Sequence, residues 1–420
     1  MKIGIIGAGI SGLTAAHYLQ HRHDVTLFET DARAGGHAHT VDVMEGDRPI
    51  PVDTGFIVFN TRTYPGFVKL LGELGVAWAD SEMSFSVRSV RRDFEYSGSG
   101  FAGLFAQKRR LLSPRFLRMV RDITRFYKEG RDLLGEGSEV SLRDWLTERE
   151  YSPGFIEDHL YPMVRAVWSA NREVAERFPA RFLARFFDNH GFLQLSGAPR
   201  WLTIPGGSRS YVRAILAGFH GQLRLGVPVR EVRRVEGGAM VWSGAANAER
   251  FDHLILACHS DQALALLGDP SELESSLLSA FPYQKNEAVL HTDESLMPRS
   301  RRAWASWNVH LDDEGSDGAC ITYWMNRLQP LGARRNYFVT LNRTNQIRPE
   351  TILRAQTYAH PVFTAAGVAA QARHAELIDC RNTSYAGAYW KNGFHEDGVA
   401  SALRVVDRLL ANAGERGVAA

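Results

Sequence analysis

The chain has 420 residues, of which 45% are hydrophobic and 23% are charged. This length allows two domains with sizeable cores, and the composition is typical of an ordinary folded protein, so extensive disorder is excluded. The three cysteines, Cys258, Cys320 and Cys380, are odd in number and far apart, which excludes a disulfide framework and favours a reducing, cytoplasmic setting.

The first thirty residues predict one βαβ unit. A β-rich run, Lys2–Ile6, is followed by an apolar stretch of helical period at about Ser11–Gln20 and by a second β-rich run, Val25–Glu29. The apolar residues from 3 to 19 are interrupted by three glycines, and they are too few for a membrane span and poorly arranged for a signal peptide. We therefore expect this stretch to belong to the fold.

A glycine fingerprint joins the first strand to the helix. Gly7 would permit a tight turn, Gly9 would let the backbone approach a pyrophosphate, and Gly12 would let the helix pack closely on the strand. The N-terminus of the helix would then face phosphate. Glu29 closes the second strand, where its carboxylate can accept hydrogen bonds from ribose hydroxyls and disfavours a 2′-phosphate. The pattern predicts FAD or NAD rather than NADP; a glycine-rich turn without a ligand is the alternative.

A second glycine pair favours FAD. Arg33 supplies a cation, and Gly35, Gly36 and His37 follow it where a nucleotide would leave the first βαβ unit. This stretch, together with the run Val52-Asp53-Thr54-Gly55, resembles the flavin amine oxidase superfamily, which includes protoporphyrinogen oxidase and phytoene desaturase. The resemblance implies that the arginine and the glycine pair flank the pyrophosphate and the flavin.

The middle of the chain predicts a helical insertion from about Phe101 to Phe187, because apolar residues recur there at spacings of three and four. Residues 88 to 131 carry twelve Lys and Arg against four acidic residues, which leaves a net charge of +8 in that segment. Interleaved basic and apolar residues are typical of an amphipathic helix that rests on anionic headgroups. The alternative is a solvated helix face whose apolar side lies in the core. Because no nucleic-acid-binding fold is recognised, we expect no nucleic-acid partner.

Two later segments also resemble the superfamily. Val229 falls in a strand whose valine backbone holds the adenine, and Tyr385–Gly398 resembles the closing flavin motif. A helix that starts near Gly398 would direct its N-terminal amides toward negative charge on the reduced flavin. FAD is expected to bind non-covalently. The residues expected to contact FAD are Gly7, Gly9, Ile10, Ser11, Gly12, Glu29, Thr30, Arg33, Gly35, Gly36, His37, Thr54, Gly55, Val229, Gly387, Glu396, Asp397 and Val399.

These segments predict an α/β protein in which a Rossmann-type FAD-binding domain is interleaved with an α+β substrate domain, as in amine oxidases and protoporphyrinogen oxidase. The FAD-binding domain is expected to comprise residues 1–90, 200–280 and 375–420. The β-rich segment that begins near Leu223 and ends at Ala257 could rejoin its sheet. The substrate domain would take residues 91–199 and 281–374, including the basic helical insertion.

A closer resemblance concerns residues 36 to 87 and several later runs. The runs His37-Ala38-His39-Thr40-Val41, Gly55-Phe56-Ile57-Val58-Phe59-Asn60 and Ala303-Trp304-Ala305-Ser306-Trp307-Asn308 are similar to the flavin-binding N-terminal region of plant cyclopropane-fatty-acid synthases. The methyltransferase half of those plant proteins is absent from this sequence. The resemblance therefore implies a stand-alone oxidoreductase, similar to bacterial flavin-dependent enzymes that desaturate methylated fatty acyl chains.

Three side chains are predicted to face the reacting atoms. Phe394 falls where amine oxidases carry one Tyr of an aromatic cage, and Tyr389 lies close to it in the sequence. Amine oxidases also place a Lys on the strand that begins the substrate sheet; the same register here gives Glu287, whose carboxylate could remove a proton during desaturation. Lys285 lies two residues away on the same strand face, so another register would restore a lysine. Core aromatics and a solvated strand carboxylate are the alternatives.

The histidines give weak evidence for a metal. His37 and His39 form a His-x-His pair on a loop with no third ligand, so we expect no metal site and place His37 beside the flavin. His259 follows an apolar strand near the expected cofactor site, and we expect a structural rather than a catalytic role for it.

The leading functional prediction is an FAD-dependent oxidoreductase that desaturates fatty acyl chains on phospholipid. Its substrate would be a lipid acyl chain or another hydrophobic small molecule, with peripheral contact to an anionic membrane at its inner face and a methyltransferase as partner. The alternatives are a flavin amine oxidase that uses O2, and a non-catalytic flavin-bound partner of an acyl-modifying methyltransferase. A second dinucleotide fingerprint is absent from the sequence, so O2 or a quinone-like compound is the expected electron acceptor.

Overall fold

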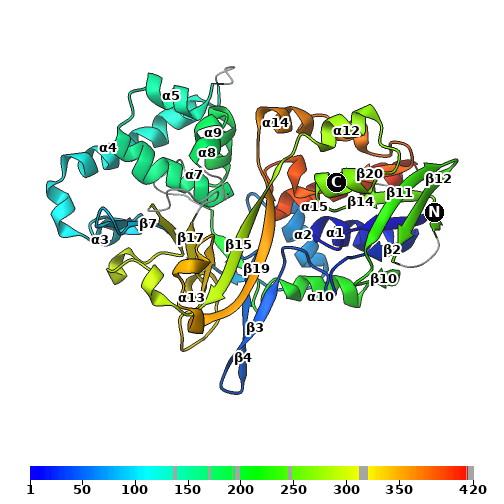
Figure 1. Cartoon of the computed structure of the whole chain (residues 1–420), viewed down its shortest axis with the longest axis horizontal. Helices are drawn as coiled ribbons and strands as arrows, with labels where there is room; N and C mark the ends of the chain where they lie inside the picture. Colours follow the sequence, from blue (N-terminus) through cyan, green and yellow to red (C-terminus); the bar gives the residue numbers. More distant parts are fainter. Residues whose placement is uncertain are drawn as a thin grey trace.

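The computed structural model describes residues 1–135, 140–168, 172–191, 193, 199–244, 248–311, 320–412 and 414. Figure 1 shows two halves side by side: a parallel sheet with its helices on the right, and a larger sheet with a helical layer on the left. The chain passes between the halves more than once. The predicted interleaved α/β architecture is therefore confirmed.

The right-hand half is built on a five-stranded parallel sheet. The predicted βαβ unit is present, because β1 spans Lys2–Ile6, α1 spans Ile10–Leu19 and β2 spans Asp24–Phe28. The order across the sheet is β10-β2-β1-β14-β20, with every neighbouring pair parallel. The other strands are β10 (Gln222–Arg224), β14 (His253–Leu256) and β20 (Thr383–Tyr385).

Three helices join α1 in the core on one face of this sheet. Parallel strands bury side chains on both faces, so each face needs a cover. α1 packs against α15 so closely that a Cβ on Gly398 would come within 2.7 Å of Ile10 Cγ2, which explains the glycine. The helices are α2 (Pro65–Glu73), α10 (Arg209–Ala217) and α15 (His395–Asn412).

A small antiparallel sheet covers the other face. The β-rich segment that begins near Leu223 therefore divides, since β10 and β14 join the parallel sheet while the strands between them form their own. These are β11 (Val229–Val235), β12 (Gly238–Ser243) and β13 (Glu249–Phe251), with α11 (Ser260–Leu266), α12 (Glu272–Leu278) and α14 (Ala365–Gln371) nearby.

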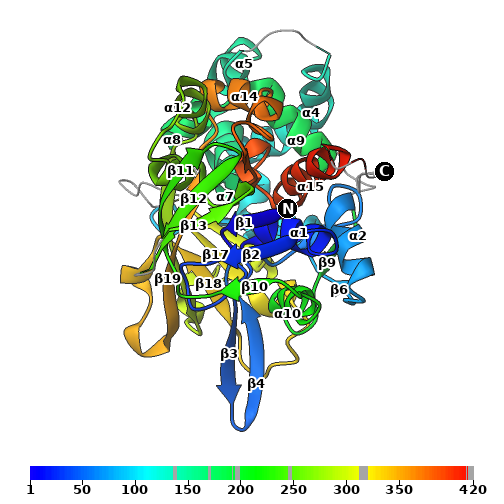
Figure 2. The same ribbon diagram turned by 90° about the vertical axis from the view of Figure 1, so that its right-hand side faces the viewer.

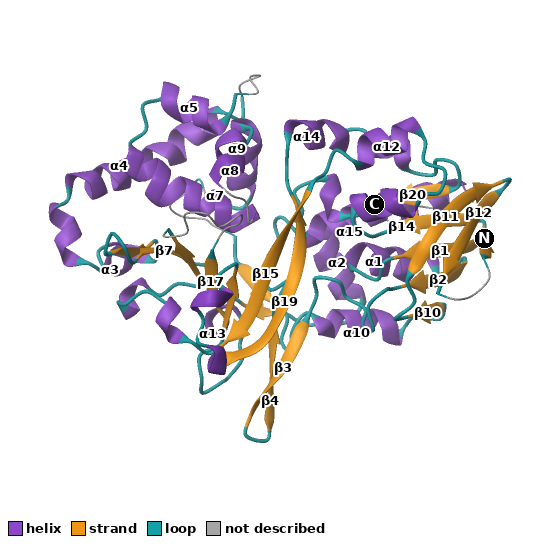
Figure 3. Cartoon of the chain, viewed as in Figure 1, coloured by secondary structure: helices purple, strands orange, loops and turns teal. Residues whose placement is uncertain are grey.

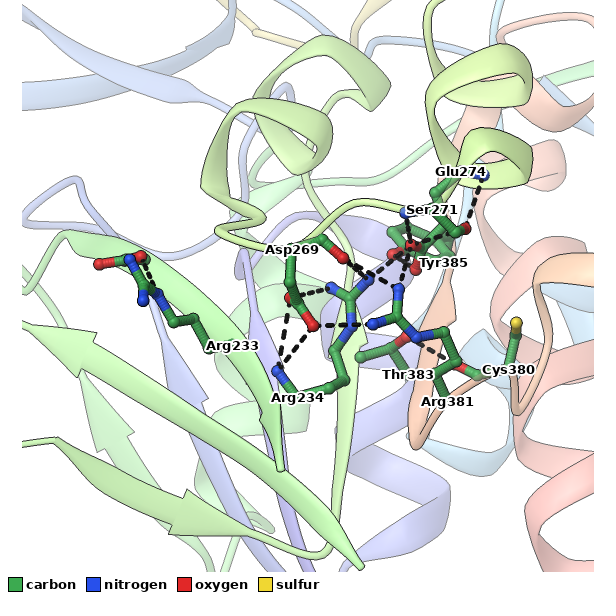
Figure 4. Close-up of polar contacts among 10 residues, drawn as sticks. Arg233, Arg234, Asp269, Ser271, Glu274, Cys380, Arg381, Thr383 and Tyr385 are labelled. Atoms are coloured by element: carbon green, nitrogen blue, oxygen red, sulfur yellow. Dashed lines mark hydrogen bonds and ion pairs between the residues drawn. The ribbon is translucent and has the colours of Figure 1, made fainter. Parts of the chain in front are cut away.

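A buried charged network fastens this small sheet to its surroundings (Figure 4). Arg234 of β11 donates to Glu274 of α12 at 2.5 Å, and the Tyr385 hydroxyl donates to the other oxygen of that carboxylate at 2.6 Å. Arg381 bridges Glu274, at 3.3 Å, and Asp269, at 2.8 Å. Because a buried carboxylate is costly without partners, this arrangement fixes how β11, α12 and β20 fit together.

The left-hand half is built on a seven-stranded sheet with the order β19-β15-β18-β17-β16-β7-β8. Its neighbouring strands are antiparallel apart from β16 and β7, which are parallel. The strands are β7 (Phe85–Ser89), β8 (Phe94–Ser97), β15 (Tyr283–His291), β16 (Trp307–His310), β17 (Ile321–Trp324), β18 (Phe338–Leu341) and β19 (Ile352–Pro361). Since β7 begins at Phe85, the first right-hand segment ends before that residue rather than at residue 90.

The predicted helical insertion lies above this sheet (Figure 3). The apolar side of α4 is buried in its core through Phe116, Met119 and Phe126. None of the described helices combines the length and the apolar composition needed to cross a bilayer. The helices are α3 (Gly100–Leu104), α4 (Pro114–Asp132), α5 (Leu142–Glu148), α6 (Pro153–Phe155), α7 (Tyr161–Trp168), α8 (Arg172–Arg177) and α9 (Ala180–Asn189).

A hairpin, β3 (Thr40–Glu45) and β4 (Arg48–Asp53), projects from the molecule (Figure 2). Near its base, the strands β5 (Phe59–Asn60), β6 (Ala79–Asp80) and β9 (Trp201–Thr203) form a three-stranded sheet.

Asp53, the last residue of β4, links the two halves. Its carboxylate accepts hydrogen bonds from the Ser208 amide at 2.9 Å and from Nε2 of Gln329 at 2.8 Å. Ser208 precedes α10 of the right-hand half, whereas Gln329 follows α13 (Met325–Leu328) of the left-hand half. Burial raises the pKa of Asp53 to about 6. The hydrogen bonds offset the free-energy cost of burying this carboxyl group and hold the two halves in a fixed relative position.

Candidate active site

A cavity of about 860 Å3 lies between the two halves. Its wall begins at the turn before α1 and the end of β2, passes the starts of β11 and α11, and ends among α7, α9 and the last residues of β19. Both halves thus contribute to it, as is common for ligand sites between domains.

The N-terminus of α1 opens into this cavity. Gly9 is the N-cap residue and has no side chain to bond the first-turn amides, and Gly9, Ile10 and Ser11 all line the wall. A Cβ on Gly9 would meet no described atom within 4 Å, so the space beside it is open. Free amides and a helix dipole directed at open space are the features that bind phosphate.

Gly7 and Gly12 allow the tight turn between β1 and α1. Gly7 has a φ of +105°, a conformation that favours glycine. A Cβ on Gly12 would lie 1.9 Å from the Gly7 carbonyl oxygen, so only glycine lets α1 begin so close to β1. Gly12 does not line the cavity. The position of Gly12 fits the packing role that was expected from the glycine fingerprint. The geometry gives no support for direct contact between Gly12 and the cofactor.

Glu29 lies at the far end of the cavity from the helical layer. Its carboxylate accepts hydrogen bonds from the Ala8 amide at 2.8 Å and from the Asp31 amide at 3.0 Å, which fixes its orientation. A carboxylate can accept further hydrogen bonds, so a ribose hydroxyl can still be accommodated. Thr30 lies beside it, and Val229, at the start of β11, lines the same end. This end therefore has the chemistry of a nucleoside site.

The second glycine pair lies next to the first. Gly35 and Gly36 have φ values of +121° and +55°, and a Cβ on Gly36 would come within 3.1 Å of Gly9 Cα. The guanidinium of Arg33 donates to the carbonyl oxygens of Gly36, at 2.9 Å, and Ala38, at 3.3 Å. Arg33 and Gly35 do not line the cavity. The guanidinium of Arg33 holds the glycine loop, and its contact with the pyrophosphate stays a prediction.

His37 faces the middle of the cavity. Its ring stacks on Tyr358, with centroids 4.9 Å apart, and lies 5.3 Å from the ring of His360. Its Nε2 atom is buried and has no hydrogen-bond partner among the residues that the structure describes. Burial, then the neighbouring imidazoles His360 and His259, lowers its pKa well below the ordinary value. A neutral imidazole with one unused nitrogen is available to a bound ligand.

Further rings, which the sequence did not single out for this role, extend the wall. His259 stacks on Tyr283, with centroids 4.5 Å apart, and Nδ1 of His360 lies 2.9 Å from Nδ2 of Asn286. Burial lowers the pKa of His259, and it lowers that of His360 to about 4. These residues come from segments far apart in the sequence; the one local signal was the position of His259, three residues after the end of the buried strand β14.

Glu287 does not reach the cavity, which corrects its predicted catalytic role. Its side chain is exposed, accepts a short hydrogen bond from the Thr344 hydroxyl and lies outside the lining, and Lys285 is exposed as well. Alternate residues of a strand point to opposite faces. The residue between them, Asn286, is the buried one that contacts His360. The predicted register therefore placed the wrong face of β15 toward the cofactor.

The closing motif, Tyr385–Gly398, contributes loop residues to the cavity wall, whereas its two acidic residues do not line the cavity. Gly387, Phe394 and His395 are part of the wall. Glu396 instead accepts hydrogen bonds from the amides at the start of α2, and Asp397 from the amides of Asn392 and Phe394. Burial raises their pKa values, to about 7 for Glu396 and to about 6 for Asp397.

Two further predicted residues also differ from expectation. Val399 is fully buried in the core between α1 and α15, so it does not line the cavity. Tyr389 borders the cavity, but its ring packs against Phe281 and Trp390. The predicted contacts that do line the cavity are Gly7, Gly9, Ile10, Ser11, Glu29, Thr30, Gly36, His37, Thr54, Gly55, Val229 and Gly387.

The end of the cavity beneath the helical layer is apolar. Phe394 stacks on Phe186, with centroids 5.2 Å apart, and Phe186 stacks on His190 at 3.9 Å. Among the described lining residues, the charged side chains are Glu29 and Asp31, both at the nucleoside end. The apolar and aromatic side chains that also line the cavity include Ile57, Val58, Met83, Ala166, Val167, Trp201, Trp307, Tyr323, Leu328, Leu341 and Phe363.

Comparison with known proteins identifies the family. The model of the family described as flavin containing amine oxidoreductase matches residues 10–301. The chain belongs to this family. As a member of this family it is a flavin-dependent oxidoreductase, with FAD as its cofactor. The uncapped start of α1, the open space at Gly9 and the unpartnered nitrogen of His37 all fit that cofactor. Non-covalent attachment stays a prediction.

The flavin-dependent L-tryptophan oxidase RebO of Lentzea aerocolonigenes is 25% identical over 287 residues, or 60% of this chain and 57% of that protein. The match thus spans a little over half the length of that relative. Cyclohexylamine oxidase from Brevibacterium oxydans IH-35A has a TM-score of 0.68 at 16% identity, covering 97% of this chain and 99% of that one. The CLA-producing fatty acid isomerase from P. acnes has a TM-score of 0.67 at 14% identity, covering 97% and 98%. At these identities the structures establish the fold alone.

Proposed function

We propose that this enzyme oxidises an uncharged, largely apolar substrate by hydride transfer. The observation that carries the proposal is the apolar end of the cavity, where the described lining contains no carboxylate, lysine or arginine. A charged group buried without a partner costs several kcal/mol or changes its protonation state, by an order-of-magnitude estimate. A substrate with a fixed charge is therefore a poor fit at this end.

The residues of the chain have three tasks in this reaction. Phe186, Phe363 and Phe394 exclude water and hold the substrate by apolar contact. FAD, when bound, supplies the acceptor for the hydride that leaves a substrate carbon together with its bonding electrons. A proton must then leave the neighbouring atom, and the imidazoles of His259 and His360, which line the cavity, are its candidate acceptors.

Two substrate classes fit these tasks. The first is an apolar amine that reacts in its neutral form, so that loss of the hydride and of an N–H proton leaves an imine. The family and the cyclohexylamine oxidase support this class. It is the class that the comparisons favour.

The second class is a fatty acyl chain, in which the hydride and a proton leave neighbouring carbons and a double bond forms. The uncharged aliphatic and aromatic lining supports this class, as does the similarity of several sequence runs to the flavin-binding region of cyclopropane-fatty-acid synthases. A methyltransferase that first methylates the chain would be the partner for such a reaction.

Anaerobic absorbance spectra of the FAD-loaded protein distinguish these classes. One series would receive apolar amines such as cyclohexylamine, and the other would receive phospholipids with methylated or cyclopropanated acyl chains. Loss of the oxidised-flavin band in one series assigns that class. If neither series reduces the flavin, the proposal of substrate oxidation is contradicted, and the role of a non-catalytic flavin-bound partner gains support.

A further inference from the structure

The end of the helical layer exposes apolar side chains next to one another in the sequence. α3, a 3-10 turn at Lys108–Leu112 and the first turns of α4 make up residues 100–118, here called the basic tip, which lies at the left end of the molecule in Figure 1. Leu112 is 87% exposed and Phe101 is 72% exposed, and Leu111 and Leu117 are each 44% exposed. Exposed apolar side chains gathered in this way mark an interaction surface more often than scattered ones do.

These side chains are not displaced core residues. α4 already buries Phe116, Met119 and Phe126 on its other side, so the core of the helical layer is supplied without Leu111, Leu112 or Leu117. The apolar residues of the predicted amphipathic pattern therefore divide into two groups. One group is buried in the core of the helical layer, and the other is exposed. Leu111, Leu112 and Leu117 belong to the exposed group.

The charge of the basic tip has one sign. Residues 100–118 contain Lys108, Arg109, Arg110, Arg115 and Arg118 and no acidic residue. Two acids outside the tip neutralise part of this charge, since Asp93 pairs with Arg109 and Asp158 pairs with Arg115 at 3.1 Å. A surface with an excess of positive charge attracts anions and is drawn toward an anionic interface.

A small cavity of about 190 Å3 opens within this region. Arg92, Arg110 and Arg115 line it with a single carboxylate, Asp158, which already binds Arg92 at 2.6 Å and Arg115 at 3.1 Å. The donors of Arg110 reach Gln107 and backbone carbonyl oxygens, and no carboxylate partner for it is found within the described part of the chain. Three guanidinium groups against one acid give the cavity a net charge of +2, which suits a phosphate.

We propose that the basic tip docks on a membrane surface that contains anionic phospholipid. A headgroup phosphate would enter the cavity of Arg92, Arg110 and Arg115, while Leu111 and Leu112 would insert at the boundary of the acyl region. Charge complementarity and the adjoining apolar side chains together favour this occupant, because a membrane offers anionic headgroups directly above acyl chains that exposed leucines can enter. The inference stands independently of the substrate class proposed above.

Co-sedimentation of the FAD-loaded, full-length chain with vesicles tests the proposal. We expect binding to vesicles of phosphatidylcholine mixed with phosphatidylglycerol, weakened by salt, and much less binding to phosphatidylcholine alone. The Arg110→Gln variant should bind about fivefold more weakly, since one basic residue near the surface contributes about 1 kcal/mol. The double variant Leu111→Ser, Leu112→Ser should lose about tenfold or more in partition.

Matched controls separate the tip from general effects. Met44→Ser removes an exposed apolar side chain from the β3–β4 hairpin, and Arg230→Gln removes an exposed charge from β11; neither should change vesicle binding. A Trp at position 112 (Leu112→Trp) should show emission that is quenched by brominated phospholipid if the tip inserts.

Several results would overturn the proposal. These are equal binding to both kinds of vesicle, unchanged binding by the tip variants, or an equal loss in the controls. Stabilisation by inorganic phosphate with no vesicle binding would replace the membrane by a free anion as the ligand. Concentration-dependent dimerisation that the leucine variant abolishes, again with no vesicle binding, would replace it by a second copy of the chain.

Discussion

The imidazole of His37 stacks on the phenol ring of Tyr358, with ring centroids 4.9 Å apart and an interplanar angle of 29°. His37 lines the cavity, and its Nε2 is a buried atom with no hydrogen-bond partner among the described residues. We predict that His37→Ala lowers the affinity for FAD about fivefold to tenfold, because a buried hydrogen bond contributes about 1 kcal/mol. Titration of the apoprotein with FAD measures this affinity.

His39→Ala is the matched control for that experiment. The His39 ring lies 3.3 Å from the Tyr358 hydroxyl but does not line the cavity, so its removal should change FAD affinity less. Equal losses in both variants would mean that the histidines only support Tyr358.

The open space at Gly9 gives a second prediction. A valine there meets no described protein atom at Cβ, and its backbone has an ordinary extended conformation, so Gly9→Val should fold normally. Its side chain would occupy the space in front of the α1 amides and weaken FAD binding by more than about tenfold. Gly72→Val, on α2 with similarly open surroundings, should retain FAD. Gly9→Val protein purified with a full complement of FAD would contradict this site.

The exposed positions on β15 give a third prediction. Glu287→Gln and Lys285→Met should leave the rate of flavin reduction within about twofold, because surface substitutions usually change free energies by about 0.5 kcal/mol or less. Phe394→Ala should lower kcat/KM for an apolar substrate about tenfold or more through lost contact in the cavity. Stopped-flow absorbance compares the variants. A large loss in Glu287→Gln alone would restore its catalytic role.

Buried histidines give a prediction for pH. Burial lowers the pKa to about 4 for His159, His190, His253, His291 and His374. Such a group stabilises the fold above its unfolded pKa of 6.5, and this contribution is lost as the pH falls toward 4, because the unfolded chain then binds more protons. At pH 5 each of these histidines lowers the free energy of unfolding by on the order of 1 to 2 kcal/mol.

Three acids oppose this trend. The raised pKa values of Asp53, Glu396 and Asp397 make the folded chain bind more protons between about pH 4 and 7, which favours folding as the pH falls. The histidines outnumber them, so thermal unfolding should show a Tm several degrees lower at pH 5 than at pH 7. A Tm that is constant or higher at pH 5 would show that these side chains are not buried in neutral form.

The opening βαβ unit was predictable because its signals are local. Gly7 and Gly12 are explained by contacts with an adjoining segment or within a few residues, Gly9 by the open space in front of α1, and Glu29 directly follows β2. The helical insertion was likewise predictable from its period. Both kinds of signal depend on short spacings along the chain.

The reacting face could not be predicted in the same way. The choice between Asn286 and Glu287 depends on which face of β15 is buried, and three neighbouring polar residues, 285 to 287, give no alternation to settle it. Tyr358 and His360 reach the cavity through the pairing of β19 with β15, which no local pattern encodes. Glu396 was expected at the flavin because it belongs to the closing motif, but its carboxylate instead accepts hydrogen bonds from the amides of Gly66 and Phe67 at the start of α2.

The apolar end of the cavity is most directly tested by the anaerobic rate of flavin reduction with L-tryptophan, compared with apolar amines and acyl phospholipids under the same conditions. The carboxylate of L-tryptophan would be buried at an end where no cation lies in the described lining. We predict that an apolar amine or acyl lipid reduces the flavin and that L-tryptophan does not. Reduction by L-tryptophan as fast as by every apolar candidate would contradict the account.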